Sequence, residues 1–521
     1  MAKYVAIIGA GISGLPAIKQ CLDSDLIPIC FEQNSFIGGL WRYEDISEKN
    51  KESYSTIYKG ILTNTSKEMS TYSDFPIPVD WPTYLNYTYV EKYIDMYAEN
   101  FNLLPHIKFN TTVLKVSILP DKRWKVKYII KSENEEKEEV FDFVMVCSGH
   151  HSKPKWPEFK GMNLFKGEQL HSYKYKRAIN FENKRVLVVG SGNSAMDIAV
   201  ELTHVASQVY ISIHSGKLPW IAPCFLKGKS QDSIIKSFPI PSHLKLPTDP
   251  LIATSSTINS EIFQCLAAGT IIVKPNIKEL KSENSQIEFV DGTILENIDV
   301  VIYSTGYYID YPFLEKHIYT GGDEIEQVYR KDFLDIAWLY RSIFSPKYPN
   351  IAFIGLAHRA GSLLPICEMQ ARYVTSLFKG SIKPLPSQNE MERSIHKYYE
   401  NGLKKYCKSA RSGIRLSHLP YMDALSKEVG CYPHPYEIFK KFGFNFWKLF
   451  MFGMATSIYS KDIGFYPHSY EIYKKFGFNF WKLFMFGMAT PIKVALTNWR
   501  DSREDAKDAT YTQIVEKDES V

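Results

Sequence analysis

The chain has 521 residues, of which 45% are hydrophobic, so it is long enough for a large core and for two to four domains. Its net charge of +5 is small and is spread along the chain, which argues against a nucleic-acid partner. The eight cysteines include no Cys-x-x-Cys pair and no His/Cys cluster at metal spacing, so we expect reduced thiols, no dithiol redox centre and no metal site.

The first predicted element is a buried parallel strand over Tyr4–Ile8, followed by the glycine-rich loop Gly9–Gly14 and a helix. In such a loop the first glycine permits a tight turn, the second lets the backbone approach a pyrophosphate, and the third lets helix and strand pack closely. The next strand, Leu26–Phe31, ends at Glu32, whose carboxylate can accept both hydroxyls of an adenosine ribose. These features favour a dinucleotide without a 2′-phosphate; a turn that serves packing alone is the alternative.

Two later strands are each followed by small residues. The charged segment Lys131–Glu139 is expected to form a hairpin tip before a strand over Val140–Val146, and Cys147–His150 follows that strand. A similar strand, Ile298–Tyr303, is followed by Ser304–Tyr307. We interpret these two points as places where the chain crosses between two nucleotide-binding domains, with two ordinary strand ends as the alternative reading.

A second strand and glycine-rich loop, Arg185–Val189 and Gly190–Ala195, lie 181 positions after the first pair. No acidic residue follows the next strand, Gln208–Ile213, and Ser215 and Lys217 come instead. A hydroxyl and an ammonium suit a 2′-phosphate, which a carboxylate would repel. The second loop therefore favours NADPH, and a solvated loop lysine is the alternative for Lys217.

Near the C-terminus one 25-residue segment occurs twice, at Tyr432–Thr456 and Tyr466–Thr490, at an offset of 34 positions and with two differences. Two copies cannot form a solenoid, which needs about three repeats, so we interpret the pair as a tandem duplication. Each copy combines many aromatic side chains with a pair of lysines. This mixture predicts a peripheral contact with a membrane surface, and packing into a core is the alternative.

Several further stretches carry a resemblance to a known family. The most specific is Phe165–Tyr175, which reads Phe-x-Gly-x-x-x-His-x-x-x-Tyr and contains His171. Others are Gly38–Trp41, Thr63–Met69, Ser73–Pro76, Ser304–Tyr307, Ile354–Leu356 and Glu368–Arg372. With these stretches the chain resembles the flavin-containing monooxygenases that oxygenate soft nitrogen and sulfur atoms. The resemblance extends to about residue 500. The related Baeyer–Villiger enzymes carry Trp-Pro at the end of the signature, and this chain does not.

This resemblance implies an α/β fold with two Rossmann-like dinucleotide-binding domains, one for FAD and one for NADPH, with the NADPH domain inserted in the FAD domain. The expected FAD domain has two parts, 1–153 and 331–430, on either side of an NADPH domain at 154–330. Residues 431–521 then form a C-terminal region that contains the duplicated segment.

The resemblance also implies an NADPH- and O2-dependent enzyme with N,N-dimethylaniline monooxygenase activity, which oxygenates small N- or S-nucleophiles through a C4a-hydroperoxyflavin. The cofactor carries the chemistry, so no general base is expected. A Baeyer–Villiger monooxygenase and a catalytically impaired flavin-binding or membrane-surface scaffold are the alternatives. The expected location is the cytoplasmic side, in peripheral contact with the endoplasmic reticulum membrane, and an oligomer is compatible with the sequence.

By the same resemblance Asn64 is the expected catalytic residue, because an amide offers the peroxide a donor and an acceptor without a proton to leak. His171 is expected to be a structural, hydrogen-bonding histidine. The expected FAD-side residues are Gly9, Gly11, Ser13, Gly14, Glu32, Gly39, Leu40, Trp41, Thr63, Asn64 and Thr65. Those expected at NADPH are Gly190, Gly192, Asn193, Ser194, Ala195, Met196, Asp197, Ser215 and Lys217.

Overall fold

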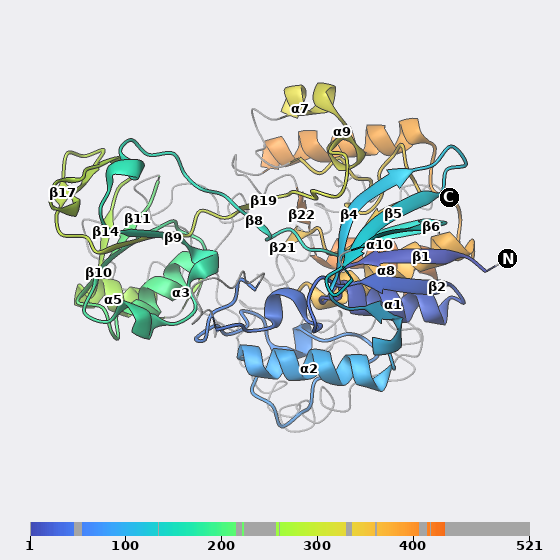
Figure 1. Cartoon of the computed structure of the whole chain (residues 1–521), viewed down its shortest axis with the longest axis horizontal. Coiled ribbons are helices and arrows are strands. Elements are labelled where there is room, and N and C mark those ends of the chain that lie inside the picture. Colours follow the sequence, from blue (N-terminus) through green and yellow to red (C-terminus); the bar gives the residue numbers. More distant parts are fainter. Residues whose placement is uncertain are drawn as a thin grey trace, which may run out of the picture. The chain divides into compact units, whose positions relative to one another are not determined.

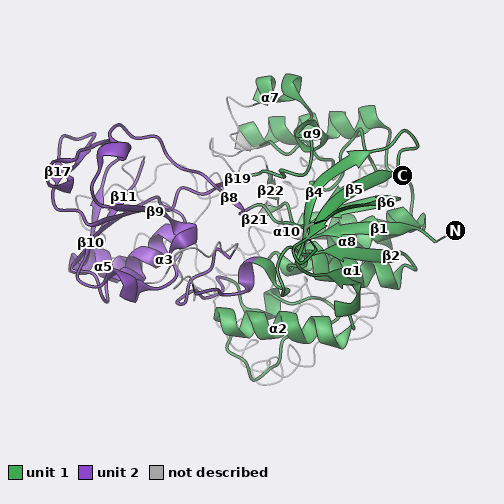
Figure 2. Ribbon diagram, viewed as in Figure 1, with its two compact units in different colours: residues 1–39, 65–150, 309–521 green, residues 40–64, 151–308 purple. Residues whose placement is uncertain are grey.

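The computed structural model describes residues 2–45, 55–133, 135–214, 221–222, 257–259, 261–329, 336–359, 362–405, 414–416 and 418–432 (Figure 1). The chain divides into two compact units, each formed by segments that are separate in the sequence (Figure 2). Unit 1 comprises Met1–Gly39, Thr65–His150 and Ile309–Val521, and unit 2 comprises Leu40–Asn64 and His151–Tyr308.

Unit 1 contains a parallel sheet with the strand order β20-β7-β1-β2-β3. Its strands are β1 (Tyr4–Ile8), β2 (Ile27–Phe31), β3 (Ile107–Lys108), β7 (Phe143–Val146) and β20 (Ile351–Phe353). Ile8 pairs with both Phe31 and Val146, and Val146 also pairs with Phe353, so four strands end in one row. The segments that follow these strands therefore begin at the same edge of the sheet.

The helices of unit 1 flank this sheet and extend beyond it (Figure 1). They are α1 (Gly14–Asp23), α2 (Tyr87–Asn100), α6 (His317–Thr320), α7 (Asp323–Tyr329), α8 (Leu364–Lys379), α9 (Gln388–Lys405) and α10 (His418–Val429). Helix α8 packs against both α1 and α10. Asn86 caps α2 by accepting from the Thr88 and Tyr89 backbone N–H groups, and Gly380 ends α8 in the left-handed conformation.

A separate antiparallel sheet in unit 1 corrects one expectation from the sequence. Its strands are β4 (Thr111–Ile118), β5 (Trp124–Ile130) and β6 (Glu136–Phe141). The acidic stretch Glu136–Glu139 is therefore part of a strand, and only residues 131–135 connect β5 to β6. The cause is cross-strand pairing, because Glu138 lies 3.1 Å from Lys125 and Glu136 also pairs with a lysine of β5. The strand expected over Val140–Val146 is divided between β6 and β7.

Unit 2 contains a second parallel sheet, with the order β14-β11-β10-β18-β9. Its strands are β9 (Glu168–His171), β10 (Arg185–Val189), β11 (Gln208–Ser212), β14 (Ile271–Lys274) and β18 (Val300–Tyr303). The described helices α3 (Asn193–Leu202) and α5 (Ile262–Ala268) pack beside it. β1 and β10 have the predicted bounds, and β18 begins two residues later than expected.

Smaller sheets complete the described strands. In unit 2, β15 (Ile277–Leu280), β16 (Ile287–Phe289) and β17 (Ile294–Leu295) form an antiparallel meander. Two-stranded pairs join β8 (Lys153–Pro154) to β19 (Tyr307–Tyr308) and β12 (Ile221–Ala222) to β13 (Thr257–Ile258). In unit 1, β21 (His358–Arg359) pairs with β22 (Arg415–Leu416).

The segment 55–64 belongs to unit 2 because side chains from the later part of the chain hold its backbone. Lys176 Nζ donates to Ser55 O at 2.6 Å and to Ile57 O at 3.3 Å. Burial lowers the pKa of Lys176 to about 8, and the two carbonyl oxygens supply acceptors for its ammonium. Gly60 lies so close to α3 that a Cβ there would come within 2.9 Å of the Glu201 carboxylate.

His171 and Tyr175 have structural roles in unit 2, which confirms the expectation for the histidine. His171 is fully buried, its Nε2 lies 3.0 Å from Gly306 O, and its Nδ1 accepts from the Tyr173 N–H. Burial lowers the pKa of His171 to about 4. Tyr175 is also fully buried, and its hydroxyl donates to Glu201 at 2.9 Å.

None of the helices in the part of the chain that the structure describes is long and apolar enough to cross a membrane. The duplicated segment, apart from Tyr432, lies outside the described residues.

We expect replacement of His171 to reduce the acid sensitivity of unit 2. An unfolded histidine titrates near pH 6.5, and His171 has a lower pKa in the folded state. Its contribution to the free energy of unfolding is therefore complete above pH 6.5 and is lost as the pH falls below that value. The loss between pH 7 and pH 5 is about 2 kcal/mol. Urea unfolding at both pH values should show a smaller loss for His171→Gln than for His204→Gln, which changes an exposed histidine of the same unit. Equal losses in the two variants would contradict this.

Candidate functional site

The first glycine-rich loop contains two glycines that the packing of unit 1 requires and one that it does not. Gly9 has a φ of +100°, and a Cβ there would lie 2.9 Å from Cys147 O. A Cβ on Gly14 would lie 1.9 Å from Gly9 O. At Gly11, by contrast, a Cβ would meet Gly39 Cα at an ordinary 3.7 Å. The protein itself thus leaves room at Gly11, where the sequence predicts the close approach of a pyrophosphate.

The helix that follows this loop begins without a side-chain cap. Its N-cap residue, Ser13, makes no capping hydrogen bond, and the first turn contains no acidic residue. The Gly14 and Leu15 N–H groups at the start of α1 donate to Gly11 O, so the helix attracts an anion mainly through the positive end of its dipole. The Ser13 hydroxyl lies instead 3.2 Å from Cys367 Sγ, so its backbone N–H is the group available to a ligand.

Glu32 is fixed at the end of β2 by two backbone donors. Its Oε2 accepts from Ala10 N at 2.8 Å and its Oε1 from Asn34 N at 2.9 Å. Burial raises the pKa of this carboxyl, while both hydrogen bonds favour the ionised form. Each oxygen keeps a further lone pair, so the group fits the paired hydroxyls of a ribose, as the sequence predicts.

The second loop repeats this design in unit 2. Gly190 has a φ of +137°, and a Cβ there would lie 2.5 Å from Ser304 O. Among the residues that the structure describes, no atom would lie within 4 Å of a Cβ on Gly192, which is the N-cap of α3. Helix α3 also begins without a side-chain cap and without an acidic residue in its first turn. The fit to a pyrophosphate is therefore the same as at the first loop.

The residues expected after Gly192 differ in what they offer to a ligand. Ser194 is exposed, whereas the side chains of Ala195 and Met196 are completely buried in the core of unit 2. Ala195 and Met196 therefore offer only their backbone to a cofactor. Ser215 and Lys217 lie outside the described residues, and their role stays a prediction.

Two side chains that sequence reasoning missed hold the second loop and its helix. Thr257 donates to Ser191 O at 2.8 Å. Asn259 donates to Asp197 at 2.7 Å, and Asp197 also accepts from the Tyr58 hydroxyl at 3.1 Å. Burial raises the pKa of Asp197 to about 6. Thr257 and Asn259 lie more than 60 positions from the loop, and no local pattern in the sequence distinguishes them.

The remaining expected residues lie where the chain passes between the two units. Gly39 begins the short helix Gly39–Trp41, and Gly39 is also the neighbour of Gly11 in unit 1. Asn64 is exposed and is the last residue of the first segment of unit 2, and Thr65 begins the next segment of unit 1. Leu40, Trp41 and Thr63 belong to unit 2.

Comparison with known proteins identifies the family. The model of the family described as "Flavin-binding monooxygenase-like" matches residues 2–239 and 241–465. The chain is 38% identical to flavin-containing monooxygenase 5 of Rattus norvegicus over 465 residues, which cover 83% of this chain and 84% of the rat protein. It is also 38% identical to the N-oxide-forming dimethylaniline monooxygenase 2 of Macaca mulatta over 464 residues, which cover 83% of this chain and 84% of the macaque protein.

Solved structures agree on the fold. The S-allyl-L-cysteine S-oxygenase from Allium sativum superimposes with a TM-score of 0.64 at 23% identity and covers 88% of this chain and 95% of its own. The two parallel sheets, with a glycine-rich loop after β1 in one and after β10 in the other, confirm the expected α/β fold with two dinucleotide-binding domains. The chain therefore belongs to the flavin-binding monooxygenase-like family.

Proposed function

We propose that the chain is an NADPH- and O2-dependent flavin monooxygenase that oxygenates soft nitrogen or sulfur atoms of small molecules. The observation that carries this proposal is the pair of glycine-rich loops, each with an open second glycine and followed by a helix without a side-chain cap. A relative named for N-oxide formation, at 38% identity, supports nitrogen oxygenation. A Baeyer–Villiger activity has less support, because cyclohexanone monooxygenase from Rhodococcus sp. Phi1 shares the fold at only 15% identity.

FAD belongs at the first loop. Gly11 admits the pyrophosphate, the N-terminus of α1 supplies the positive end of the helix dipole and the Ser13 N–H, and the Glu32 carboxylate accepts the ribose hydroxyls. Since Glu32 is buried and already fixed by two N–H groups, it needs no reorganisation to receive the ribose. Once bound, the flavin supplies the electron transfer and the activation of dioxygen. The protein holds and orients it.

NADPH belongs at the second loop. Gly192 leaves the backbone open, and the first turn of α3, with Asn193 and Ser194, offers N–H and hydroxyl donors to the pyrophosphate. The strand β11 ends at Ser212, and no carboxylate follows it in the sequence to repel a 2′-phosphate. Ser215 and Lys217 are the proposed ligands of that phosphate.

Asn64 is the proposed catalytic residue. Its side chain is exposed, so its amide is available to a bound group rather than committed to the core. A neutral amide stabilises developing negative charge through its N–H donors and does not itself transfer a proton. The substrate class follows from this: a small nucleophile that reacts without the help of a general base.

The two open glycines provide a matched pair of variants. Gly11→Val should purify with less than about a tenth of the wild-type FAD, because its side chain occupies the space of the pyrophosphate. Gly192→Val should keep its FAD but raise the KM for NADPH about tenfold or more, for the same steric reason. Flavin absorbance and NADPH oxidation in air measure the two effects, and each variant is the other's control. Full FAD content in Gly11→Val would refute the first assignment, and an unchanged KM in Gly192→Val the second.

Replacement of Asn64 should separate flavin reduction from oxygenation. In Asn64→Ala we expect NADPH to reduce the flavin at the wild-type rate, while oxygenated product per NADPH falls about tenfold or more and hydrogen peroxide replaces it. Stopped-flow absorbance gives the reduction rate, and peroxide and product assays give the ratio. Leu62→Ala, which truncates an exposed neighbour, should leave the ratio unchanged. An unaltered ratio in Asn64→Ala would remove Asn64 from the proposed mechanism.

We further propose peripheral membrane contact through the duplicated aromatic segments, with location on the cytoplasmic face of the endoplasmic reticulum. Two weak contacts on one chain reinforce each other. Deletion of residues 432–465 joins Cys431 directly to the second copy. We expect this variant to keep its FAD and to float less with vesicles that contain anionic lipid. Loss of FAD with unchanged vesicle binding would show that the segment is part of the core.

A further inference from the structure

Side chains from elsewhere in unit 1 fix the backbone of the first glycine-rich loop. Glu32 accepts from Ala10 N, and the Ser13 hydroxyl contacts Cys367. A third contact comes from Tyr72, which is fully buried and whose hydroxyl donates to Ile12 O at 2.6 Å. Burial also raises the pKa of Tyr72, so its hydroxyl keeps the proton that it donates.

The contact between Tyr72 and Ile12 determines the direction of a neighbouring donor. The Ile12 carbonyl and the Ser13 N–H belong to one planar trans peptide group, so they point in opposite directions. Ser13 is the N-cap of α1, and its N–H is among the donors proposed for the pyrophosphate. When the Tyr72 hydroxyl holds the carbonyl, it also holds this N–H in one orientation.

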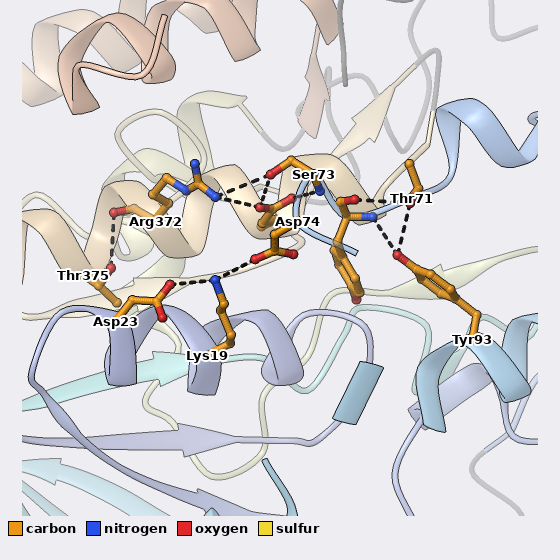
Figure 3. A network of polar contacts seen from close by, with 10 residues as sticks. Lys19, Asp23, Thr71, Ser73, Asp74, Tyr93, Arg372 and Thr375 are labelled. Atoms are coloured by element: carbon orange, nitrogen blue, oxygen red, sulfur yellow. Dashed lines mark hydrogen bonds and ion pairs between the residues drawn. The ribbon is translucent and has the colours of Figure 1, made fainter. Parts of the chain in front are cut away.

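Tyr72 is in turn held in an aromatic cluster that it forms with Tyr93 and Tyr97 of α2. Its backbone N–H donates to the Tyr93 hydroxyl at 2.8 Å (Figure 3). Tyr93 in turn donates to Phe75 O at 2.6 Å. The ring of Tyr97 lies 4.4 Å from the ring of Tyr72, centroid to centroid. The Tyr97 hydroxyl is buried and has no hydrogen-bond partner among the described residues.

The residues that follow Tyr72 are tied to two helices by buried charge. Ser73 N donates to Glu368 at 2.6 Å, the Ser73 hydroxyl donates to the same carboxylate, and Arg372 pairs with it at 2.8 Å (Figure 3). Asp74 pairs with Lys19 of α1 at 2.6 Å. The segment is thereby attached to α8 on one side and to α1, the helix that begins at the loop, on the other.

We propose that Tyr72 is a positioning residue for FAD, which keeps the glycine-rich loop in the conformation that receives the pyrophosphate. The inference rests on the proposed function, because it takes FAD to be the ligand of this loop. Without the Tyr72 hydroxyl the peptide group between Ile12 and Ser13 is free to rotate, so fewer molecules present the Ser13 N–H to the ligand. The apparent affinity falls by the factor by which the competent population falls.

The test compares Tyr72→Phe with Tyr97→Phe. Both remove one buried hydroxyl from the same aromatic cluster, but only the first removes a hydrogen bond to the loop. Apoprotein is titrated with FAD, and the bound flavin is followed by its fluorescence. We expect the Kd for FAD to rise about tenfold in Tyr72→Phe, as for loss of one such hydrogen bond, and to stay within about twofold of wild type in Tyr97→Phe.

Further measurements separate positioning of FAD from a purely structural role for Tyr72. If Tyr72 positions FAD, the KM for NADPH of Tyr72→Phe at saturating FAD should equal that of wild type, and the two apoprotein variants should unfold at the same temperature. An equal Kd in the two variants, or weaker FAD binding accompanied by a lower apoprotein Tm in Tyr72→Phe alone, would overturn the inference. Wild-type apoprotein that binds no FAD would instead overturn the proposed function.

A second variant covers the case in which Tyr72→Phe does not fold. Ser73→Ala keeps the tyrosine but removes one of the bonds that attach its segment to Glu368. We expect a rise of about threefold in the Kd for FAD, smaller than in Tyr72→Phe because the Ser73 N–H still donates to the carboxylate. An unchanged Kd in Ser73→Ala would then overturn the inference.

Discussion

Both candidate sites depend on how little space the backbone has at the ends of β1 and β10, where the two glycine-rich loops begin. Gly9 and Gly190 have positive φ, and a Cβ on either would collide with the carbonyl oxygen at the end of a neighbouring strand. The second glycine of each loop, Gly11 or Gly192, has room around it in the described part of the chain. The first glycine therefore permits the turn, and the second leaves the backbone exposed beside the positive end of a helix dipole.

Each unit has its own glycine-rich loop, and the two units support these loops with different side chains. Unit 1 places the Glu32 carboxylate and the Tyr72 hydroxyl against the loop backbone. Unit 2 uses the neutral donors Thr257 and Asn259, which contact the loop and Asp197 respectively. The carboxylate beside the first loop suits a nucleotide with free ribose hydroxyls. The sequence has no carboxylate soon after β11, so the second loop suits a nucleotide with a 2′-phosphate.

Buried charge in unit 1 contributes to orientation more than to stability. A buried ion pair such as Glu368–Arg372 gains little net free energy, because desolvation of both groups offsets their attraction. It does impose one arrangement, since the Glu368 carboxylate accepts from both the backbone and the hydroxyl of Ser73. Exposed pairs such as Lys127–Glu136 on β5 and β6 carry no comparable constraint, because water screens them.

The sequence by itself determined the features that depend on neighbours along the chain. The strands Tyr4–Ile8 and Arg185–Val189, the two loops and Glu32 follow local rules of hydrophobic pattern and glycine spacing, and the structure has all of them. Local composition was misleading at Glu136–Glu139, where acidic residues that look like a turn form a strand opposite the lysines of β5.

Only the tertiary structure decided which distant residues support the two loops and the segment 55–64. Tyr72 reaches Ile12 across 60 positions, Thr257 reaches Ser191 across 66, and Lys176 reaches Ser55 across 121. Tyr72 and Lys176 adjoin stretches that carry the family resemblance, but nothing in those stretches names the backbone group that either side chain contacts. Each partner is a backbone carbonyl, a group that every residue carries, so no pattern of residue types can identify the pair before the chain has folded.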